Sequence, residues 1–217
     1  MLLRCSRWGV GPHLDPQTSV QNPGKEVSIS DIALILRAAE FAAHKHCKQR
    51  RKGKTRRPYI DHCIEVAGIL ADVGKVETGD VLAAAFLHDT VEDAKTTREE
   101  LRREFGSAID DLVAQVTDDE ALDKDDRKKA QVEEAPTLSD GAKLIRLADR
   151  ISNVLEVSND PPKGWDIDRR EKYFAESKRV VAALAGVNAD LERTAAEALS
   201  EASNKLAKEK EKEKEKN

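Results

Sequence analysis

Most hydrophobic positions of this chain recur at helical spacing. From Asp31 onward, "DIALILRAAEFAAHKH" carries apolar residues three and four positions apart, and Ser30 is available as an N-terminal cap. We expect one stripe of this helix to face a core, formed by Ile32, Ile35, Leu36, Ala39 and Ala43. Further along, "TREELRREFG" predicts a helix with a capping box of Thr97 and Glu100.

The same spacing continues through most of the remaining sequence. Helical stretches are "HCIEVAGILADVG", "SAIDDLVAQV", "GAKLIRLADRISNVLEV", "RREKYFAESKRVVAALAG" and "NADLERTAAEALSEASNKLA". No stretch of useful length alternates apolar and polar residues as a β-strand does, and no hairpin turn separates two such stretches. The pattern therefore predicts an all-α helical bundle without internal repeats.

Both ends of the chain lack this periodicity. Residues 1–28 mix Gly, Pro, Ser, Gln and Asn, which predicts a flexible N-terminal arm. Residues 201–217 form a charged C-terminal extension, in which alternating Lys and Glu from Lys208 to Lys216 predict a solvated helix or disorder. One domain, residues 29–200, is expected between them.

The composition supports an all-α domain and argues against a membrane partner. Charged residues make up 36% of the 217 and aromatic residues only 4%, which favours helices with wet outer faces. Three cysteines without paired spacing indicate free thiols, as in a reducing cytoplasm. No apolar stretch approaches the roughly 20 residues that span a bilayer. We expect a cytoplasmic protein with no membrane partner, and Gly9, Gly11 and Pro12 disfavour an N-terminal targeting helix.

A basic run is the one feature that suggests nucleic acid. Between Lys45 and Arg57 lie eight Lys or Arg residues. The run has no interleaved aromatic residues, and the whole chain has a net charge of -4. We therefore expect no nucleic-acid partner, and interpret the run as a solvated loop or as a rim that attracts a polyphosphorylated nucleotide.

The stretch "FLHDTVEDA" is the strongest candidate for chemistry. It places His88, Asp89, Glu92 and Asp93 directly after the apolar run 81–87. On a helix, positions three and four apart share one patch. Three carboxylates packed so closely at a buried helix end repel one another and lose hydration, so a cation is expected to compensate. We predict a metal site.

Other helices offer the remaining ligands. His62 opens "HCIEVAGIL", and Asp149 lies at the edge of the buried stripe in "KLIRLADRISN". Two imidazoles and two carboxylates suit manganese, iron, cobalt, nickel or zinc, and disfavour calcium. We interpret His44 and His46 as basic residues that favour a helix C-terminus, without a further role. Trp165 is interpreted as a loop anchor.

These residues resemble a known family. His62, the pair His88-Asp89 and Asp149 match the H…HD…D signature of the HD phosphohydrolase superfamily. The stretches "QRRKG", "PYIDH", "AAFLHDTVEDA", "VTDDEALDK" and "KLIRLADRISN" are similar to the hydrolase domain of the RelA/SpoT alarmone enzymes, above all to its stand-alone small alarmone hydrolases. The resemblance runs from about residue 31 to 199 and implies an HD-domain helical bundle.

The resemblance assigns roles to particular residues. It implies four metal ligands, with Mn²⁺ the usual ion: His62, His88, Asp89 and Asp149. It implies that Glu92 and Asp93 position or activate the attacking water and assist proton transfer, without saying which residue handles the proton. It implies six substrate-binding residues: Arg51, Lys52, Asn153, Tyr173, Lys124 and Arg169. Of these, Arg51 is expected against the guanine base, whereas Lys124 and Arg169 are weaker matches expected at phosphates. One departure is Cys63, where the family usually has proline.

The function implied is hydrolysis of the 3′-pyrophosphate of the guanosine alarmones ppGpp and pppGpp to GDP or GTP and pyrophosphate. Because the chain is too short for a synthetase domain, we expect degradation without synthesis. Two alternatives stay open: another nucleotide substrate, such as the 2′-phosphate of NADPH, and a non-catalytic nucleotide-binding module. Intact Glu92 and Asp93 argue against the second. Tyr59 is left open between a structural and a catalytic role, and the oligomeric state is undetermined.

Overall fold

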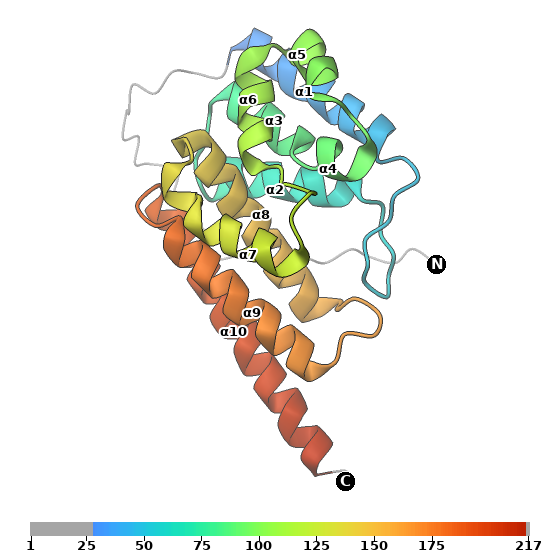
Figure 1. The fold of residues 1–217 in the computed structure, drawn as a ribbon, viewed down its shortest axis with the longest axis vertical. Helices are drawn as coiled ribbons and strands as arrows, with labels where there is room; N and C mark the ends of the chain where they lie inside the picture. Colours follow the sequence, from blue (N-terminus) through green and yellow to red (C-terminus); the bar gives the residue numbers. More distant parts are fainter. Residues whose placement is uncertain (1–27, 216–217) are drawn as a thin grey trace, which may run out of the picture.

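A computed structural model describes residues 28–215, which fold into a bundle of helices (Figure 1). The helices are α1 (Ile29–Lys45), α2 (Ile60–Asp72), α3 (Gly79–Leu87), α4 (Thr90–Ala94), α5 (Arg98–Phe105), α6 (Ser107–Val116), α7 (Lys124–Glu133), the short 3-10 helix η1 (Ala135–Thr137), α8 (Asp140–Asn159), α9 (Ile167–Ala183) and α10 (Ala189–Lys214). Within the described range there is no β-strand, only an isolated bridge between Arg50 and Pro58. The all-α bundle expected from the spacing is confirmed.

The first helix begins earlier than expected and turns a different face to the core. Ser28, not Ser30, is the N-cap, because its hydroxyl accepts from the Asp31 N–H at 3.1 Å. Ile32 and Leu36 are 49% and 64% exposed, so the predicted stripe is wrong at these two positions, whereas its member Ile35 does pack against the core. The buried face consists of Leu34, Ile35, Ala38, Phe41 and Ala42. Apolar residues crowd the positions from 32 to 36, so spacing alone allowed two stripes. The packing of α1 against α3 chooses between them.

Helix α3 lies at the centre of the larger hydrophobic cluster. It packs against α1, α2, α6 and α8. Its buried side chains are Val81, Leu82, Ala83, Ala84, Ala85 and Leu87. An element enclosed on several sides has little freedom to move, so α3 fixes the position of the residues that follow it.

The predicted continuous helix through residues 88 to 93 is broken. Helix α3 ends at Leu87 and α4 begins at Thr90, so His88 and Asp89 form the junction between them. The Thr90 hydroxyl donates to the Leu87 carbonyl at 2.7 Å, and Asp89 leaves helical geometry at φ -98° and ψ 0°. The polar side chains nevertheless stay together, because the break is only two residues long.

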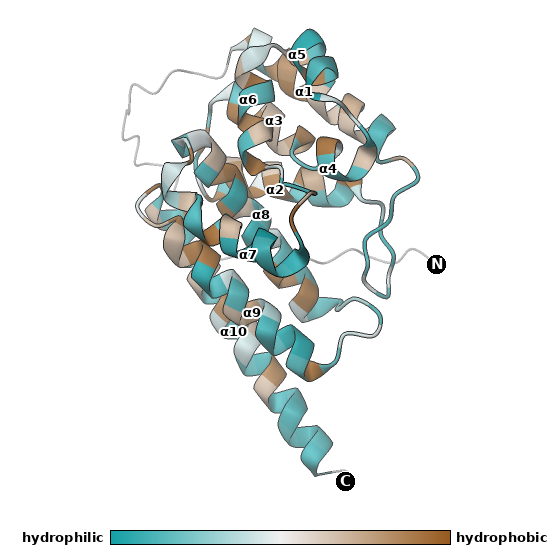
Figure 2. Cartoon of the chain, viewed as in Figure 1, coloured by the Kyte–Doolittle hydropathy of each residue, from teal (hydrophilic) through white to brown (hydrophobic). Residues whose placement is uncertain are grey.

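A second hydrophobic cluster joins α8, α9 and α10. Its members are Val154, Val157, Ile167, Phe174, Ala198, Leu199, Ala202 and Leu206. Helix α10 runs without interruption through residue 200, so the expected boundary of the C-terminal extension falls inside a helix whose next turns are still packed. The turns after Leu206 are hydrophilic (Figure 2). The predicted N-terminal arm lies outside the described residues except for Ser28.

Two details of the helices depart from expectation. Helix α7 has no buried residue, so a search for apolar stripes missed it; its start is marked by Asp123, whose side chain accepts from the N–H groups of residues 125 and 126. Thr97 caps α5 as expected, but the Glu100 side chain forms an ion pair with Lys45 at 2.8 Å instead of closing a capping box. None of the described helices has an apolar stretch long enough to cross a bilayer.

Candidate metal centre and nucleotide pocket

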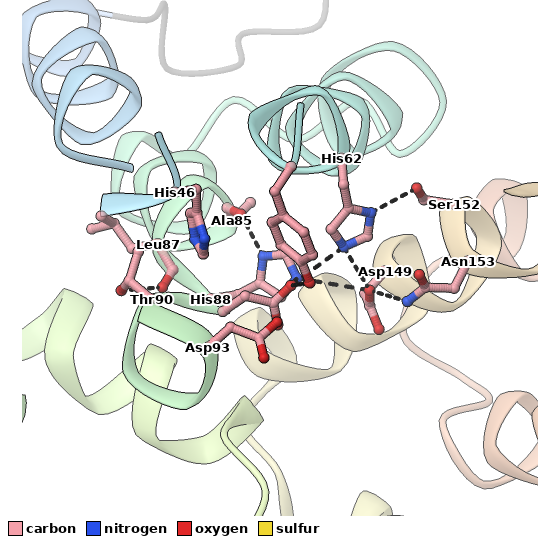
Figure 3. Close-up of polar contacts among 12 residues, drawn as sticks. His46, His62, Ala85, Leu87, His88, Thr90, Asp93, Asp149, Ser152 and Asn153 are labelled. Carbon is pink, nitrogen blue, oxygen red and sulfur yellow. Dashed lines mark hydrogen bonds and ion pairs between the residues drawn. The ribbon is translucent and has the colours of Figure 1, made fainter. Parts of the chain in front are cut away.

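Imidazoles and carboxylates from three parts of the bundle meet at one point (Figure 3). Ligand atoms of His62 from α2, His88 from the α3–α4 junction and Asp149 from α8 all lie within 4.8 Å of one another. His62 Nε2 is 3.1 Å from Asp149 Oδ1, and His88 Nε2 is 3.0 Å from Asp89 Oδ2. The structure thus brings together the four side chains expected to be metal ligands.

Hydrogen bonds on the far side of each ring fix how the histidines face this cluster. His88 Nδ1 lies 2.8 Å from the Ala85 carbonyl, which can only accept, so Nδ1 carries the proton. His62 Nδ1 lies 3.0 Å from the Ser152 hydroxyl, which donates its own proton to Glu65 at 3.0 Å and therefore accepts from the ring. Both Nε2 atoms then present lone pairs to the cluster. This is the usual arrangement of metal-binding histidines.

The donor set fits a divalent transition metal. Both Nε2 atoms are buried without a hydrogen-bond donor within the described structure. Lone pairs of imidazole nitrogen beside two carboxylates form a mixed nitrogen and oxygen site. A buried polar atom is normally paired, so these nitrogens indicate that the cluster binds a cation.

The pKa shifts within the cluster also indicate that it favours a positive charge. Burial disfavours every charge here, but the imidazoles of His62 and His88 outweigh it and hold the pKa of Asp149 far below its ordinary value. The pKa of Asp89 is lowered for the same reason. Burial likewise opposes charge on His88, yet Asp89 and Asp149 raise its pKa well above the ordinary value. The two carboxylates are stabilised by a positive charge beside them. A proton on the imidazoles or a bound metal ion can provide this charge, so the two compete.

The carboxyl pair expected to handle water lies beside this cluster on α4. Burial raises the pKa of Glu92 to about 7, and the negative charges of Asp118, Asp89 and Asp93 add to the rise. A carboxyl group with a pKa near neutrality both gives and takes a proton at working pH, as a general acid or base must. Asp93 instead accepts a hydrogen bond from Gln49 Nε2 at 3.0 Å.

A cavity of about 330 Å³ extends from the metal cluster along α8. Four of the six expected substrate-binding residues line it: Arg51, Lys52, Asn153 and Tyr173. Lys124 and Arg169 do not line it. Lys124 is the first residue of α7, and the Arg169 guanidinium lies 4.5 Å from the centre of the Trp165 ring. Trp165 itself lines the cavity.

Arg51 links the far end of the cavity to the metal cluster. Its guanidinium is paired with the buried Glu156, and its Nη2 donates to Asn153 Oδ1 at 2.7 Å. Asn153 Nδ2 in turn donates to Asp149 Oδ1 at 2.5 Å. These residues of α8 are spaced at helical intervals, so a ligand that touches Arg51 is held in register with the metal site.

Several residues of the site were left open, misread or missed from the sequence. Tyr59 donates its hydroxyl proton to Asp89 Oδ2 at 2.6 Å, and burial together with the Asp89 charge raises its pKa. The interpretation of His46 as a helix-end charge is wrong, because His46 is only 2% exposed and burial lowers its pKa. Arg146 and Arg150 also line the cavity and were missed. Both lie within one helical turn of Asp149, and this spacing could have indicated that they lie beside the same site.

The departure at Cys63 does not disturb the centre. Cys63 lies inside α2, which already begins at Ile60, so the ligand His62 is held by helical backbone. The thiol is fully buried, and burial raises its pKa to about 12. It therefore stays protonated and offers no thiolate to a metal.

Comparison with known proteins decides the family. A family model described as an HD domain matches residues 38–170. This chain belongs to the HD domain family. It is 47% identical over 163 residues to the guanosine-3′,5′-bis(diphosphate) 3′-pyrophosphohydrolase MESH1 of Xenopus tropicalis, covering 75% of this chain and 91% of that protein. The MESH1 of Homo sapiens gives the same identity and coverage.

A solved structure gives the same result for the fold of this HD domain. It is described as a metazoan ortholog of SpoT that hydrolyzes ppGpp, and it matches with a TM-score of 0.76 and 40% identity, covering 78% of this chain and 95% of that one. A longer relative, the 3′-pyrophosphohydrolase of Aquifex aeolicus, is 36% identical over 159 residues, which make up 21% of its length. The resemblance to the stand-alone alarmone hydrolases is confirmed.

Proposed function

We propose that this protein hydrolyses the 3′-pyrophosphate of ppGpp and pppGpp, giving GDP or GTP and pyrophosphate, with Mn²⁺ as its natural metal. The observation that carries the proposal is the convergence of His62, His88, Asp89 and Asp149 beside a cavity, in a chain 47% identical to named 3′-pyrophosphohydrolases. The same cavity is lined by four cationic side chains, those of Arg51, Lys52, Arg146 and Arg150. The ion itself is chosen on the family resemblance, since the donor set also suits other divalent metals.

The reaction breaks one phosphorus–oxygen bond. Water attacks the phosphorus attached to the ribose 3′ oxygen, and the bond from that phosphorus to the 3′ oxygen breaks. Pyrophosphate and a 3′ hydroxyl result, so one proton leaves the water and one reaches the ribose oxygen. When bound, a divalent metal ion would supply positive charge at the phosphoryl oxygens and acidify a water molecule.

Residues of the chain supply the remaining steps. Glu92 is the better candidate to take the proton of the attacking water and return one to the leaving oxygen, because its pKa is about 7. Asp93 orients the water. Lys52, Arg146 and Arg150 line the cavity and oppose the negative charge of the phosphates. Arg51 and Asn153 hold the nucleoside end.

The alternative substrate NADPH is not favoured, because the relatives named above are 3′-pyrophosphohydrolases of a guanosine nucleotide. A cytoplasmic location and the lack of a nucleic-acid partner stay predictions.

Metal-stripped protein incubated with ppGpp, NADPH and several nucleoside triphosphates, with and without Mn²⁺, tests the proposal. We expect GDP and pyrophosphate from ppGpp only when metal is present. Parallel reactions with Zn²⁺, Co²⁺ and Mg²⁺ rank the metals. Turnover of another nucleotide, with ppGpp left intact in the presence of every metal, would refute the assignment.

A further inference from the structure

A hydrogen-bonded chain from α1 reaches the catalytic carboxylate. His46 follows the last residue of α1 and is 2% exposed, with Nδ1 2.6 Å from Gln49 Oε1. Gln49 Nε2 lies 3.0 Å from Asp93 Oδ2. Figure 3 shows His46 on the same side of the site as Asp93. His46 and Gln49 have no role in the proposed reaction itself, but their hydrogen bonds lead to Asp93, which does.

The direction of each hydrogen bond in this chain follows from donor and acceptor chemistry. A carboxylate only accepts, so Gln49 turns its amide NH₂ toward Asp93. Its carbonyl oxygen then faces His46 and accepts, which requires the proton of the His46 ring to be on Nδ1. Were the proton on Nε2, a lone pair of Nδ1 would face the amide oxygen. The His46 ring therefore fixes the orientation of the Gln49 amide, and the amide fixes the orientation of the Asp93 carboxylate.

The chain is backed by a rigid frame. The His46 and Tyr59 rings stack with centroids 4.8 Å apart, and the Tyr59 hydroxyl donates to Asp89 Oδ2. The Tyr59 backbone N–H also bonds to the Gln49 carbonyl at 3.2 Å. A single stacked pair therefore sets the position of a metal-cluster carboxylate on one side and of Asp93 on the other.

Asp93 needs such support. Its side chain is exposed and stands on α4, which has only five residues and is followed by Lys95 with a left-handed φ of 56°. An exposed carboxylate on so short a helix would sample several rotamers, whereas catalysis needs one near-attack geometry.

We propose that His46 and Gln49 are positioning residues that hold the Asp93 carboxylate toward the attacking water. The kinetic part of this inference rests on the proposed function. A purely architectural role would make variants at 46 and 49 less stable without changing the turnover of the folded molecules. A positioning role lowers kcat and leaves KM unchanged, because the nucleotide contacts at Arg51 and Asn153 are not touched.

Kinetics of the full-length protein with Mn²⁺ and ppGpp separate the two roles. Gln49→Met keeps the length of the side chain and removes the amide, and we expect kcat to fall by about 10- to 100-fold at constant KM. His46→Leu should show the same loss, and His46→Asn, whose amide nitrogen replaces the Nδ1 donor, should recover part of it. His44→Asn is the matched control, because His44 is exposed in the last turn of α1, two residues before His46.

Thermal unfolding of each variant accompanies the assays, and Gln49→Met decides if His46→Leu does not fold, since residue 49 is half-buried on a loop. Wild-type kcat in Gln49→Met would overturn the proposal, as would equal losses in folded His46→Leu and His46→Asn. A fall in kcat accompanied by an equal rise in KM would also overturn it.

Nitrogen-15 NMR of the histidine rings tests the hydrogen-bond direction without any substrate. Zinc-loaded protein is used because Mn²⁺ broadens the signals. We expect the Nδ1–H tautomer of His46 in the wild type and its loss in Gln49→Met, and an Nε2–H tautomer in the wild type would overturn the chain. If the wild type did not turn over ppGpp, the proposed function would fail while this measurement still decided the geometry.

Discussion

At the scale of single residues, the site depends on which nitrogen of each histidine carries a proton. His62 and His88 both protonate Nδ1 against an acceptor outside the cluster, which leaves Nε2 free for a metal. His46 uses the same tautomer for a different purpose, to orient an amide. The hydrogen bonds at the Nδ1 atoms therefore determine what the other atoms of these side chains can bind or orient.

Ser152→Ala tests this dependence. The change removes the acceptor of the His62 Nδ1–H while leaving the metal-facing atoms in place, so we expect about a 10- to 100-fold weaker metal affinity. Metal titration of the stripped protein measures it. Ser158→Ala, on the same helix, is the control. Equal affinity in the two variants would show that the Ser152 hydroxyl does not tune the ligand.

Glu92→Gln tests the raised pKa of Glu92. The ordinary pKa is 4.5 and the folded value about 7, so between these values the folded state binds a proton that the unfolded state releases. Stability of the metal-free wild type therefore contains a term that is lost as pH rises from about 4.5 through about 7. Gln has no such term, so the variant should gain stability relative to wild type over this window, as urea unfolding measures.

The same variant separates catalysis from stability. Because Gln cannot accept a proton, kcat should fall by at least about 100-fold even though the fold is stabilised. A stability difference independent of pH would contradict the raised pKa, and retained turnover would transfer the proton-handling role to Asp93.

At the scale of elements, the loop between α1 and α2 carries Arg51 and Lys52 into the cavity and is fastened by the end of α8. Asp160 accepts from the N–H groups of Lys54 at 2.8 Å and Thr55 at 3.1 Å. A side chain at Gly53 would place its Cβ 2.7 Å from the Asp160 backbone oxygen, so this close approach requires glycine. The loop is thus a docked element and not merely a solvated one.

Asp160→Ala should release this loop. We expect a higher KM for ppGpp with kcat largely kept, because Arg51 and Lys52 lose their fixed position while the metal cluster does not. The free energy of unfolding should fall by about 1 kcal/mol for these exposed hydrogen bonds. Steady-state kinetics and urea unfolding measure both effects, with Asp168→Ala, an exposed carboxylate of α9, as control. An unchanged KM would mean that the loop is held by other contacts.

How far the sequence predicted these elements depended on the kind of signal. The Thr97 cap was found because capping is local, and the metal-cluster residues because a spaced signature marks them. The buried face of α1 was not found, since only packing against α3 chooses between its two possible stripes. Gln49 and Ser152 were not found either, because their partners lie 44 and 90 residues away along the chain.

At the scale of the whole molecule, the site lies where two hydrophobic clusters share α8. Ile145 and Ile151 belong to the cluster around α3, and Val154 and Val157 to the cluster with α9 and α10. The cavity is lined by Ile145 of the first cluster and by Val157 of the second, and Tyr173 and Trp165, which also line it, pack against the second. A ligand in the cavity therefore contacts both halves of the bundle.

Metal should stabilise the whole bundle because its ligands come from α2, the α3–α4 junction and α8. An ion that binds only the folded state raises the free energy of unfolding by about 2.7 kcal/mol at 100 times its Kd. Protons compete for the same imidazole nitrogens, and the pKa of His88 is raised in the metal-free cluster. The stabilisation should therefore grow as pH rises from about 5 to about 8.

Thermal unfolding with and without Mn²⁺, repeated across this pH range, measures the effect. Asp89→Ala is the matched variant, because it removes one carboxylate of the cluster and should lose most of the metal-dependent shift at every pH. The variant also distinguishes two places of binding. Metal bound at exposed acidic side chains elsewhere on the surface would still stabilise Asp89→Ala, whereas metal bound at the centre would not. A shift of equal size in wild type and Asp89→Ala, or one that does not change with pH, would contradict binding of the ion by the four side chains His62, His88, Asp89 and Asp149.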